Sequence, residues 1–87
     1  MPYRGVAAVV IVKTGNKKTK YTIENDAIVD IYTTGATYSG VRVTGVNRTG
    51  ENIRYIAPEG GANEIPMNLI TKVVDCGLTE FSGVRIG

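Results

Sequence analysis

The sequence predicts a single domain over residues 1–87, all-β and folded as a small, strongly bent barrel. Strands are indicated by the frequency of Val, Ile, Thr and Tyr, whereas Leu occurs only at Leu69 and Leu78. Eleven glycines in 87 residues place turn signals along the chain. Turns at intervals of roughly 8–12 residues are typical of small antiparallel barrels and sandwiches. No segment has a helical apolar period, so no long helix is expected.

Residues 1–26 are expected to form an N-terminal β-hairpin extension of this barrel. Val6–Val12 is a continuous apolar run of valine, isoleucine and alanine, which is typical of a strand covered on both faces. "KTGNKK" then supplies a Gly-Asn turn, and Lys18–Glu24 alternates, with Tyr21 and Ile23 on one face. A small barrel has too little interior to cover both faces of Val6–Val12. Contact with another subunit is therefore expected at this strand.

Residues 27–75 are expected to form the barrel itself. Gly40 and Gly45 interrupt its long second strand, where glycine indicates a bulge or a sharp bend. Pro66 cannot donate a ladder hydrogen bond, and Met67–Leu69 has room for one 3₁₀ turn. Residues 76–87 are expected to form a weaker final strand, Leu78–Ile86, or an arm. The expected barrel strands are Ala27–Thr33, Thr37–Val46, Asn52–Ala57, Glu64-Ile65 and Ile70–Asp75.

Charge is unevenly distributed along the chain, although the net charge is only +2. Residues 1–23 contain five cations and no acid, and residues 42–58 contain three arginines against Glu51. A basic hairpin and an arginine-bearing strand pair with tyrosines between them can bind phosphates and stack bases. Ordinary solvated charge is the alternative. The candidate cations for nucleic acid are Lys17, Lys18, Lys20, Arg42, Arg48 and Arg54, with Tyr21, Tyr38 and Tyr55 interleaved.

Histidine, the commonest general base and the commonest metal ligand, is absent from the sequence. Ser39 and Ser82 therefore lack a histidine partner for a triad. Cys76 is the only cysteine, which excludes an intrachain disulfide and a thiolate zinc cluster. The glycines of "PEGGAN" are flanked by Glu59 and Glu64, which repel phosphate, so a hairpin turn is predicted there. We expect no enzyme activity, no cofactor and no metal.

Location follows from the same features. A chain that depends on burial and has one cysteine is expected in a reducing compartment, here the cytoplasm. No apolar run is long enough to span a membrane. Arg4 before Val6–Val12 resembles a short signal peptide, but no small-residue cleavage pattern follows, so a buried strand is the preferred interpretation.

The order of features in residues 27–75 resembles an SH3-like small barrel, and among these the Sm-like family. The resemblance rests on "TTGATYSGVRVTGVN", "NIRYIA" and "EIPMNLITKVV". The last stretch is similar to the short strand, single turn and closing strand that end SH3-like barrels.

The resemblance implies a ring of subunits joined through edge strands, with RNA bound near the pore by two loops. It places Asn47, Arg48 and Asn52 in the first loop, and Met67 and Asn68 near the second. The expected function is therefore a non-catalytic, ring-forming module that binds RNA or single-stranded DNA. The alternative is a structural or protein-interaction subunit of a homo-oligomeric assembly, such as a phage-like one. In both cases the chain's first partner is itself, through edge strands and Val6–Val12.

Overall fold

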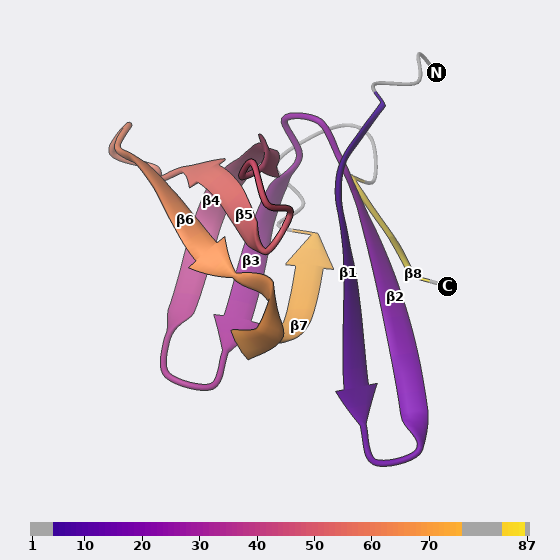
Figure 1. Cartoon of the computed structure of the whole chain (residues 1–87). Helices are drawn as coiled ribbons and strands as arrows, with labels where there is room; N and C mark the ends of the chain where they lie inside the picture. Colours follow the sequence, from indigo (N-terminus) through magenta and orange to yellow (C-terminus); the bar gives the residue numbers. More distant parts are fainter. Residues whose placement is uncertain (1–4, 76–82, 87) are drawn as a thin grey trace.

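The computed structural model describes residues 5–75 and 83–86, and it confirms the all-β prediction (Figure 1). Most expected strand boundaries lie within two residues of the observed ones, and the strand Ile70–Asp75 agrees at both ends. The elements are β1 (Val6–Thr14), β2 (Lys17–Glu24), β3 (Ile28–Thr33), β4 (Thr37–Val46), β5 (Asn52–Ile56), β6 (Ala62–Pro66), the 3₁₀ turn η1 (Met67–Leu69), β7 (Ile70–Asp75) and β8 (Val84–Ile86).

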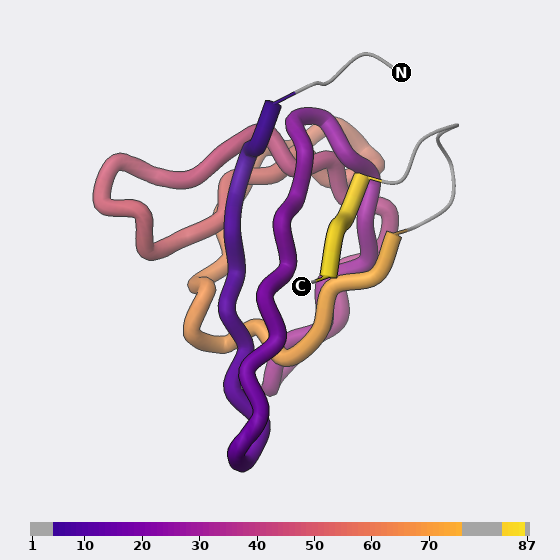
Figure 2. The backbone as a smooth tube through the Cα atoms, turned by 90° about the vertical axis from the view of Figure 1, so that its right-hand side faces the viewer, coloured from indigo at the N-terminus to yellow at the C-terminus, as the bar shows by residue number. Residues whose placement is uncertain are grey.

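The described strands form two antiparallel sheets that pack against each other. One has the order β1-β2-β8 and the other the order β6-β5-β4-β3-β7. Figure 2 shows the three-stranded sheet lying across the curved five-stranded sheet as a separate layer. The predicted N-terminal hairpin is thus present, and it forms most of one layer of the fold.

The two sheets share one hydrophobic core. The inner face of the hairpin supplies Ala8, Val10, Val12, Tyr21 and Ile23, all buried. Their partners on the five-stranded sheet are Val29, Ile31, Val41, Val43, Ile53, Tyr55, Ile65, Ile70 and Val73, also buried. Burial on this scale is the main favourable term for a chain of this size.

Only one face of β1 is covered. Val10 and Val12 are buried, but Val9 is 40% exposed and Ile11 is 60% exposed. The single chain therefore leaves the second face of Val6–Val12 open, and the expected cover by another subunit stays a prediction. The physical reason for the open face is that β1 belongs to an outer layer, and neither of the two described sheets packs on its second face.

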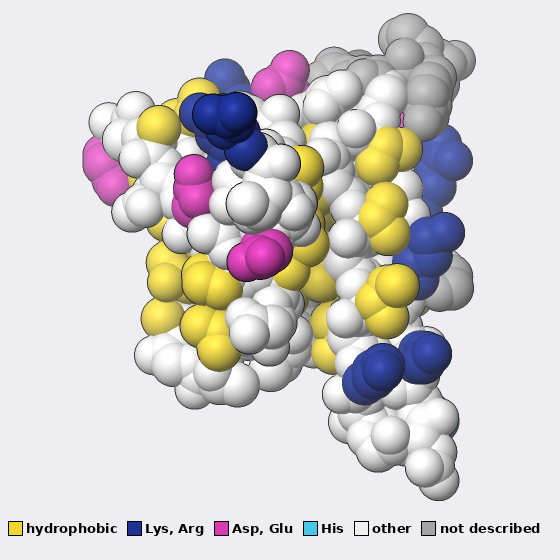
Figure 3. Space-filling model, in the orientation of Figure 1, with side chains coloured by type: hydrophobic (Ala, Val, Ile, Leu, Met, Phe, Trp, Pro, Cys, Tyr) yellow, Lys and Arg dark blue, Asp and Glu magenta, His cyan; other side chains and the backbone are white. Residues whose placement is uncertain are grey.

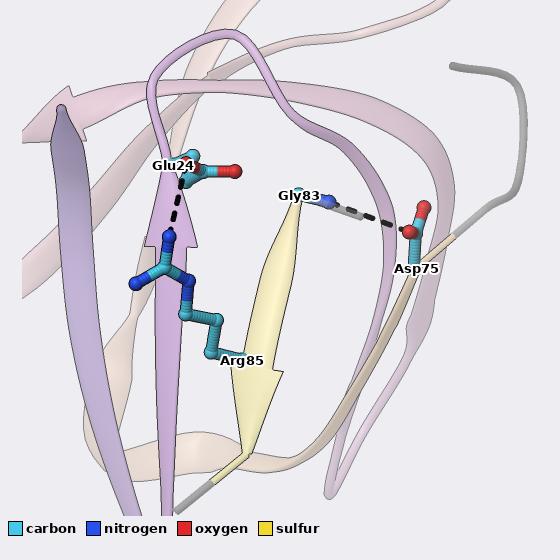
Figure 4. Close-up of polar contacts among 4 residues, drawn as sticks. All are labelled: Glu24, Asp75, Gly83 and Arg85. Atoms are coloured by element: carbon cyan, nitrogen blue, oxygen red, sulfur yellow. Dashed lines mark hydrogen bonds and ion pairs between the residues drawn. The ribbon is translucent and has the colours of Figure 1, made fainter. Parts of the chain in front are cut away.

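The short strand β8 pairs with β2, opposite Tyr21–Ile23, and buries Val84. The backbone N–H of Glu24 donates to the carbonyl of Gly83 at 2.9 Å. Figure 4 shows Arg85 reaching the buried carboxylate of Glu24, at 3.8 Å, and the Gly83 N–H donating to Asp75. The final strand was expected over Leu78–Ile86. Its last three residues are a strand, and residues 78–82, like Cys76, lie outside the described residues.

Two bulges bend β4 at the glycines that the sequence singled out. Between Val29 and Ile31, β3 advances two residues while β4 advances three, from Tyr38 to Val41. Gly40 sits in this extra position with φ of +65°, a conformation that glycine adopts without strain. A second bulge at Gly45 lies opposite β5. Both bulges increase local twist, which helps the sheet to curve around its core.

The carboxylate of Asp30 stabilises the first bulge. Its Oδ1 accepts a hydrogen bond from the backbone N–H of Gly40 at 2.9 Å, in a half-buried position. A bulge leaves backbone groups outside the ladder, and an unsatisfied buried N–H is costly. Asp30 therefore has a structural role that its place in the sequence does not reveal.

The Asp30→Ala substitution is expected to lower the free energy of unfolding by about 1–2 kcal/mol, because the Gly40 N–H loses a charged acceptor. Asp30→Asn keeps an acceptor oxygen and should lose less. Urea denaturation of the three proteins measures the difference. Equal stability of the Asp30→Ala variant and the original protein would contradict this role.

Candidate nucleic-acid interface

Three lysines gather on the outer face of the β1–β2 hairpin. Lys13 and Lys18 are direct cross-strand partners, and Lys20 is the partner of Ile11. All three are exposed, and they alternate with the buried residues Val12, Tyr21 and Ile23. We call Lys13, Lys18 and Lys20 the lysine face. Lys17 lies beside it at the start of β2, opposite Thr14, on the other side of the ladder.

The charge of the lysine face is not neutralised by its own strands. Residues 1–23 contain no acid. Like charges directly opposite each other on a ladder destabilise it, and Lys13 and Lys18 are such a pair. The nearest acid along β2 is Glu24, which is buried and paired with Arg85 at the far end of the strand. This half of the outer face is therefore a positive surface available to an external anion.

A groove of about 670 Å³ runs beside the free end of the hairpin. Its lining combines apolar side chains with the two opposed lysines. Leu69 is 43% exposed there, and Thr34 is held nearby because its N–H donates to the Leu69 carbonyl. The main lining residues are Ile11, Lys13, Lys18, Met67, Asn68 and Leu69.

The candidate arginines do not join the lysine face. Arg42 and Arg54 lie on the outward side of β4 and β5, since the alternate residues Val41, Val43 and Tyr55 face the core. Figure 3 shows cations in two regions, one over β4 and β5 and one along the hairpin. Arg54 also lies opposite Glu64 across the ladder. The eight predicted residues thus form at least two separate groups, because the two outer faces point away from each other.

The side chains of both candidate asparagines are engaged in hydrogen bonds, that of Asn47 within its own turn and that of Asn52 with the neighbouring strand β6. Asn47 Oδ1 accepts hydrogen bonds from the backbone N–H of Glu51 at 3.0 Å, from that of Asn52 at 3.1 Å and from the Thr49 hydroxyl at 3.2 Å. Asn52 donates its amide to Glu64 Oε1 at 3.0 Å. Such local bonds are typical of asparagine in turns. Arg48 is exposed in the same turn.

The two loops named by the family resemblance do meet. The backbone N–H of Met67 donates to the Glu51 carbonyl at 2.9 Å. Asn52, Met67 and Asn68 line one open pocket of about 470 Å³, together with Glu51 and Pro66. This pocket has no cation in its lining, which makes it a poorer anion site than the lysine face.

Sequence reasoning did not select Lys13, although the signal was present. A two-residue Gly15-Asn16 turn makes Thr14 and Lys17 partners, and the next pair along the ladder is then Lys13 and Lys18. The turn geometry alone would have placed the two lysines together. Ile11 and Leu69 could not be found this way, because their exposure depends on how the sheets pack.

Two tyrosines form a pair on the curved sheet. The rings of Tyr38 and Tyr55 are 5.8 Å apart and tilted by 57°. Burial raises the pKa of the Tyr55 phenol above its ordinary value, and Tyr38 and Glu59 raise that pKa further. Tyr55 is buried and packs in the core cluster, so it serves the fold and not a stacking platform.

Metal and membrane features can be stated for residues 5–75 and 83–86. No group of three or more Cys, His, Asp or Glu side chains lies close enough there to hold a metal ion. The same residues include no helix with the length and apolar character needed to cross a membrane.

The raised pKa of Tyr55 predicts a loss of stability at alkaline pH. The folded protein holds the phenol proton more tightly than the unfolded chain, so this stabilisation is present below about pH 10 and lost as the pH rises through the folded pKa. The free energy of unfolding, measured by urea denaturation between about pH 9 and 11, should fall less steeply with pH for Tyr55→Phe, by at most about 1.4 kcal/mol per pH unit. Tyr32→Phe, on an exposed tyrosine, is the control. Identical pH profiles for Tyr55→Phe and the original protein would contradict the prediction.

Comparison of the chain with protein-family models, with curated proteins and with solved structures gave no match. What the protein binds must therefore be inferred from its own surface.

Proposed function

We propose that the protein is a non-catalytic, SH3-like barrel module of the Sm-like kind, which assembles with itself and binds RNA or single-stranded DNA. The barrel part of the proposal is supported by the strand order β6-β5-β4-β3-β7 and by the 3₁₀ turn directly before β7. Strand β7 returns to pair with β3, the first strand of the meander. A closed ring through the edges β6 and β7 belongs to the same proposal.

The observation that carries nucleic-acid binding is the opposed pair Lys13 and Lys18. Two like charges facing each other weaken a hairpin by a few tenths to about 1 kcal/mol. A bound phosphate removes this repulsion and gains charge-assisted hydrogen bonds. Lys20 extends the same face by two residues, about 7 Å along the strand, so a backbone with repeating phosphates can engage more than one lysine.

A single strand suits this face better than a duplex. Val9 and Ile11 lie beside the lysines on the same face and are exposed. Unpaired bases can pack on apolar side chains while their phosphates reach the lysines, whereas a duplex keeps its bases stacked inside. The surface offers no aromatic platform among its described residues, so little sequence preference is expected.

A structural or protein-interaction subunit is the second candidate, and the exposed apolar residues of β1 favour it. Val6, Val9 and Ile11 are at least 40% exposed on one strand. Such a row often marks a protein contact. This function shares the fold and the self-assembly of the first candidate but needs no nucleic acid.

Neutralising the lysine face is expected to weaken oligonucleotide binding and its salt dependence. The logarithm of the association constant falls linearly as the logarithm of the salt concentration rises. For Lys18→Gln with Lys20→Gln, this negative slope should become shallower by about 1.4, because each lost phosphate contact removes about 0.7 from its magnitude. Fluorescence anisotropy with a labelled uridine oligonucleotide, over a series of salt concentrations, measures the slope.

Arg48→Gln with Arg54→Gln is the matched control, because it removes the same net charge from the other cationic region. An equal loss in both double variants would show that binding follows net charge and not the lysine face. Absence of binding by the unmodified protein at low salt would overturn the proposed function and leave the structural candidate.

A further inference from the structure

We infer that β1 is a self-association edge, at which two copies pair antiparallel about Val10 and join their three-stranded sheets into one sheet of six. This inference deepens the self-assembly part of the proposed function, since it names the contact surface. It does not depend on nucleic acid. The contact also leaves β6 and β7 free, so it is separate from a ring built on those edges.

Four strands end the two described sheets, and β1 is the least protected of them. Natural edges are blunted by short length, proline, charge or bulges. Strand β8 has three residues, β6 contains Glu64 and ends at Pro66, and β7 carries Lys72 and a register shift at its β3 partner Thr33. Strand β1 has nine residues and no proline; its one charged residue, Lys13, lies next to its last residue, and its single bulge lies at Ala7, near its start.

Exposed apolar side chains are concentrated on the same strand. Among the described residues, β1 contributes three of the seven large hydrophobic side chains that are exposed, namely Val6, Val9 and Ile11. Figure 3 shows an apolar column along this strand with lysines beside it. Alternate residues of β1 direct their backbone N–H and C=O groups away from β2. An arriving strand would therefore gain ladder hydrogen bonds and apolar contact together.

The side chains select one register. Facing residues of an antiparallel pair share a face, so inward residues must meet inward residues. Centring on Val10 sets Val9 against Ile11 of the other copy, and Ala8 against its Val12. Centring on Ile11 would set Val9 against Lys13, which is a poorer pair. Around Val10 the regular segment Ala8–Val12 is used in full and the bulge stays outside it.

Charge and shape agree with this register. Lys13 of each copy comes opposite Ala7 of the other, so the two lysine faces lie at opposite ends and do not repel at short range. The groove beside Lys13 has apolar side chains in its lining, including Leu69 and Met67. The start of the partner's β1, with the exposed Val6, approaches this groove. Apolar surface on each copy thus meets apolar surface on the other.

The size of the contact predicts a reversible dimer. A standard stable interface uses roughly 20–30 residues from each partner, whereas β1 offers nine. We expect the dimer to dissociate in the micromolar range or above, and to form fully only at high protein concentration.

Ile11→Lys tests the contact directly, because Ile11 is exposed and its replacement should leave the fold intact. Sedimentation velocity over a concentration series should show a monomer–dimer equilibrium for the original protein and a weakening of at least tenfold for Ile11→Lys. Val46→Lys places the same charge at another exposed apolar residue, on β4, and it should dimerise normally. A monomer at all concentrations, or equal effects of both variants, would overturn the inference.

Cysteine cross-linking tests the register. In a Cys76→Ser background, Val9→Cys and Ile11→Cys proteins should form intermolecular disulfides much faster when mixed than either does alone, because only the mixture sets the two cysteines directly opposite. Equally fast cross-linking within each single variant would contradict pairing about Val10.

The two proposals fail in distinguishable ways. A dimer that binds no oligonucleotide contradicts nucleic-acid binding and supports the β1 contact. A monomer that binds oligonucleotide contradicts the β1 contact and supports nucleic-acid binding. A larger closed particle that is unchanged by Ile11→Lys contradicts the β1 contact and supports a ring through other edges.

Discussion

The core shared between the two sheets is the constraint on which the rest of the structure depends. Neither sheet could fold alone, because each has one apolar face that needs a cover. The β1–β2 hairpin supplies that cover with Ala8, Val10 and Ile23, and the curved sheet supplies its own apolar face in return. The curvature comes from the bulges in β4, and Asp30 fastens the first of these through the Gly40 N–H. Once the hairpin is committed to covering the core, its other face must meet solvent or another molecule.

That second face combines two properties that have different physical consequences. The opposed lysines attract anions over several ångströms and respond to salt. The apolar residues of β1 act only on contact, and salt does not screen their interaction. Edge pairing about Val10 would place the apolar residues of two copies in the middle of one face, with a lysine face at each end. A single strand crossing this surface would then meet two cationic ends, so that self-association would increase binding by linking two weak sites.

Features set by local chemistry could be predicted from the sequence. The Gly15-Asn16 turn, the bulges at Gly40 and Gly45, the halt at Pro66 and the 3₁₀ turn at Met67–Leu69 all follow from the residues at those positions, and all are observed. Features set by packing could not. Residues far apart in the chain decide which face of Val6–Val12 is exposed and that β8 pairs with β2.

The candidate site, too, could be predicted from the sequence only in part. Lys18 and Lys20 were found from charge alone, whereas the separation of the arginines from them and the use of Asn47 inside its own turn required the folded structure.

The pairing of β2 with β8 also bears on how the chain reaches this structure. It joins Tyr21 to Ile86, the two ends of a span that includes the whole curved sheet. Contacts of such long sequence separation form slowly, since the loop must close before the contact contributes. During synthesis the hairpin emerges early, but the layer that it belongs to cannot be completed until β8 has left the ribosome. Until then β2 is an unpaired edge as well as β1, and the layer consists of the two-stranded hairpin alone.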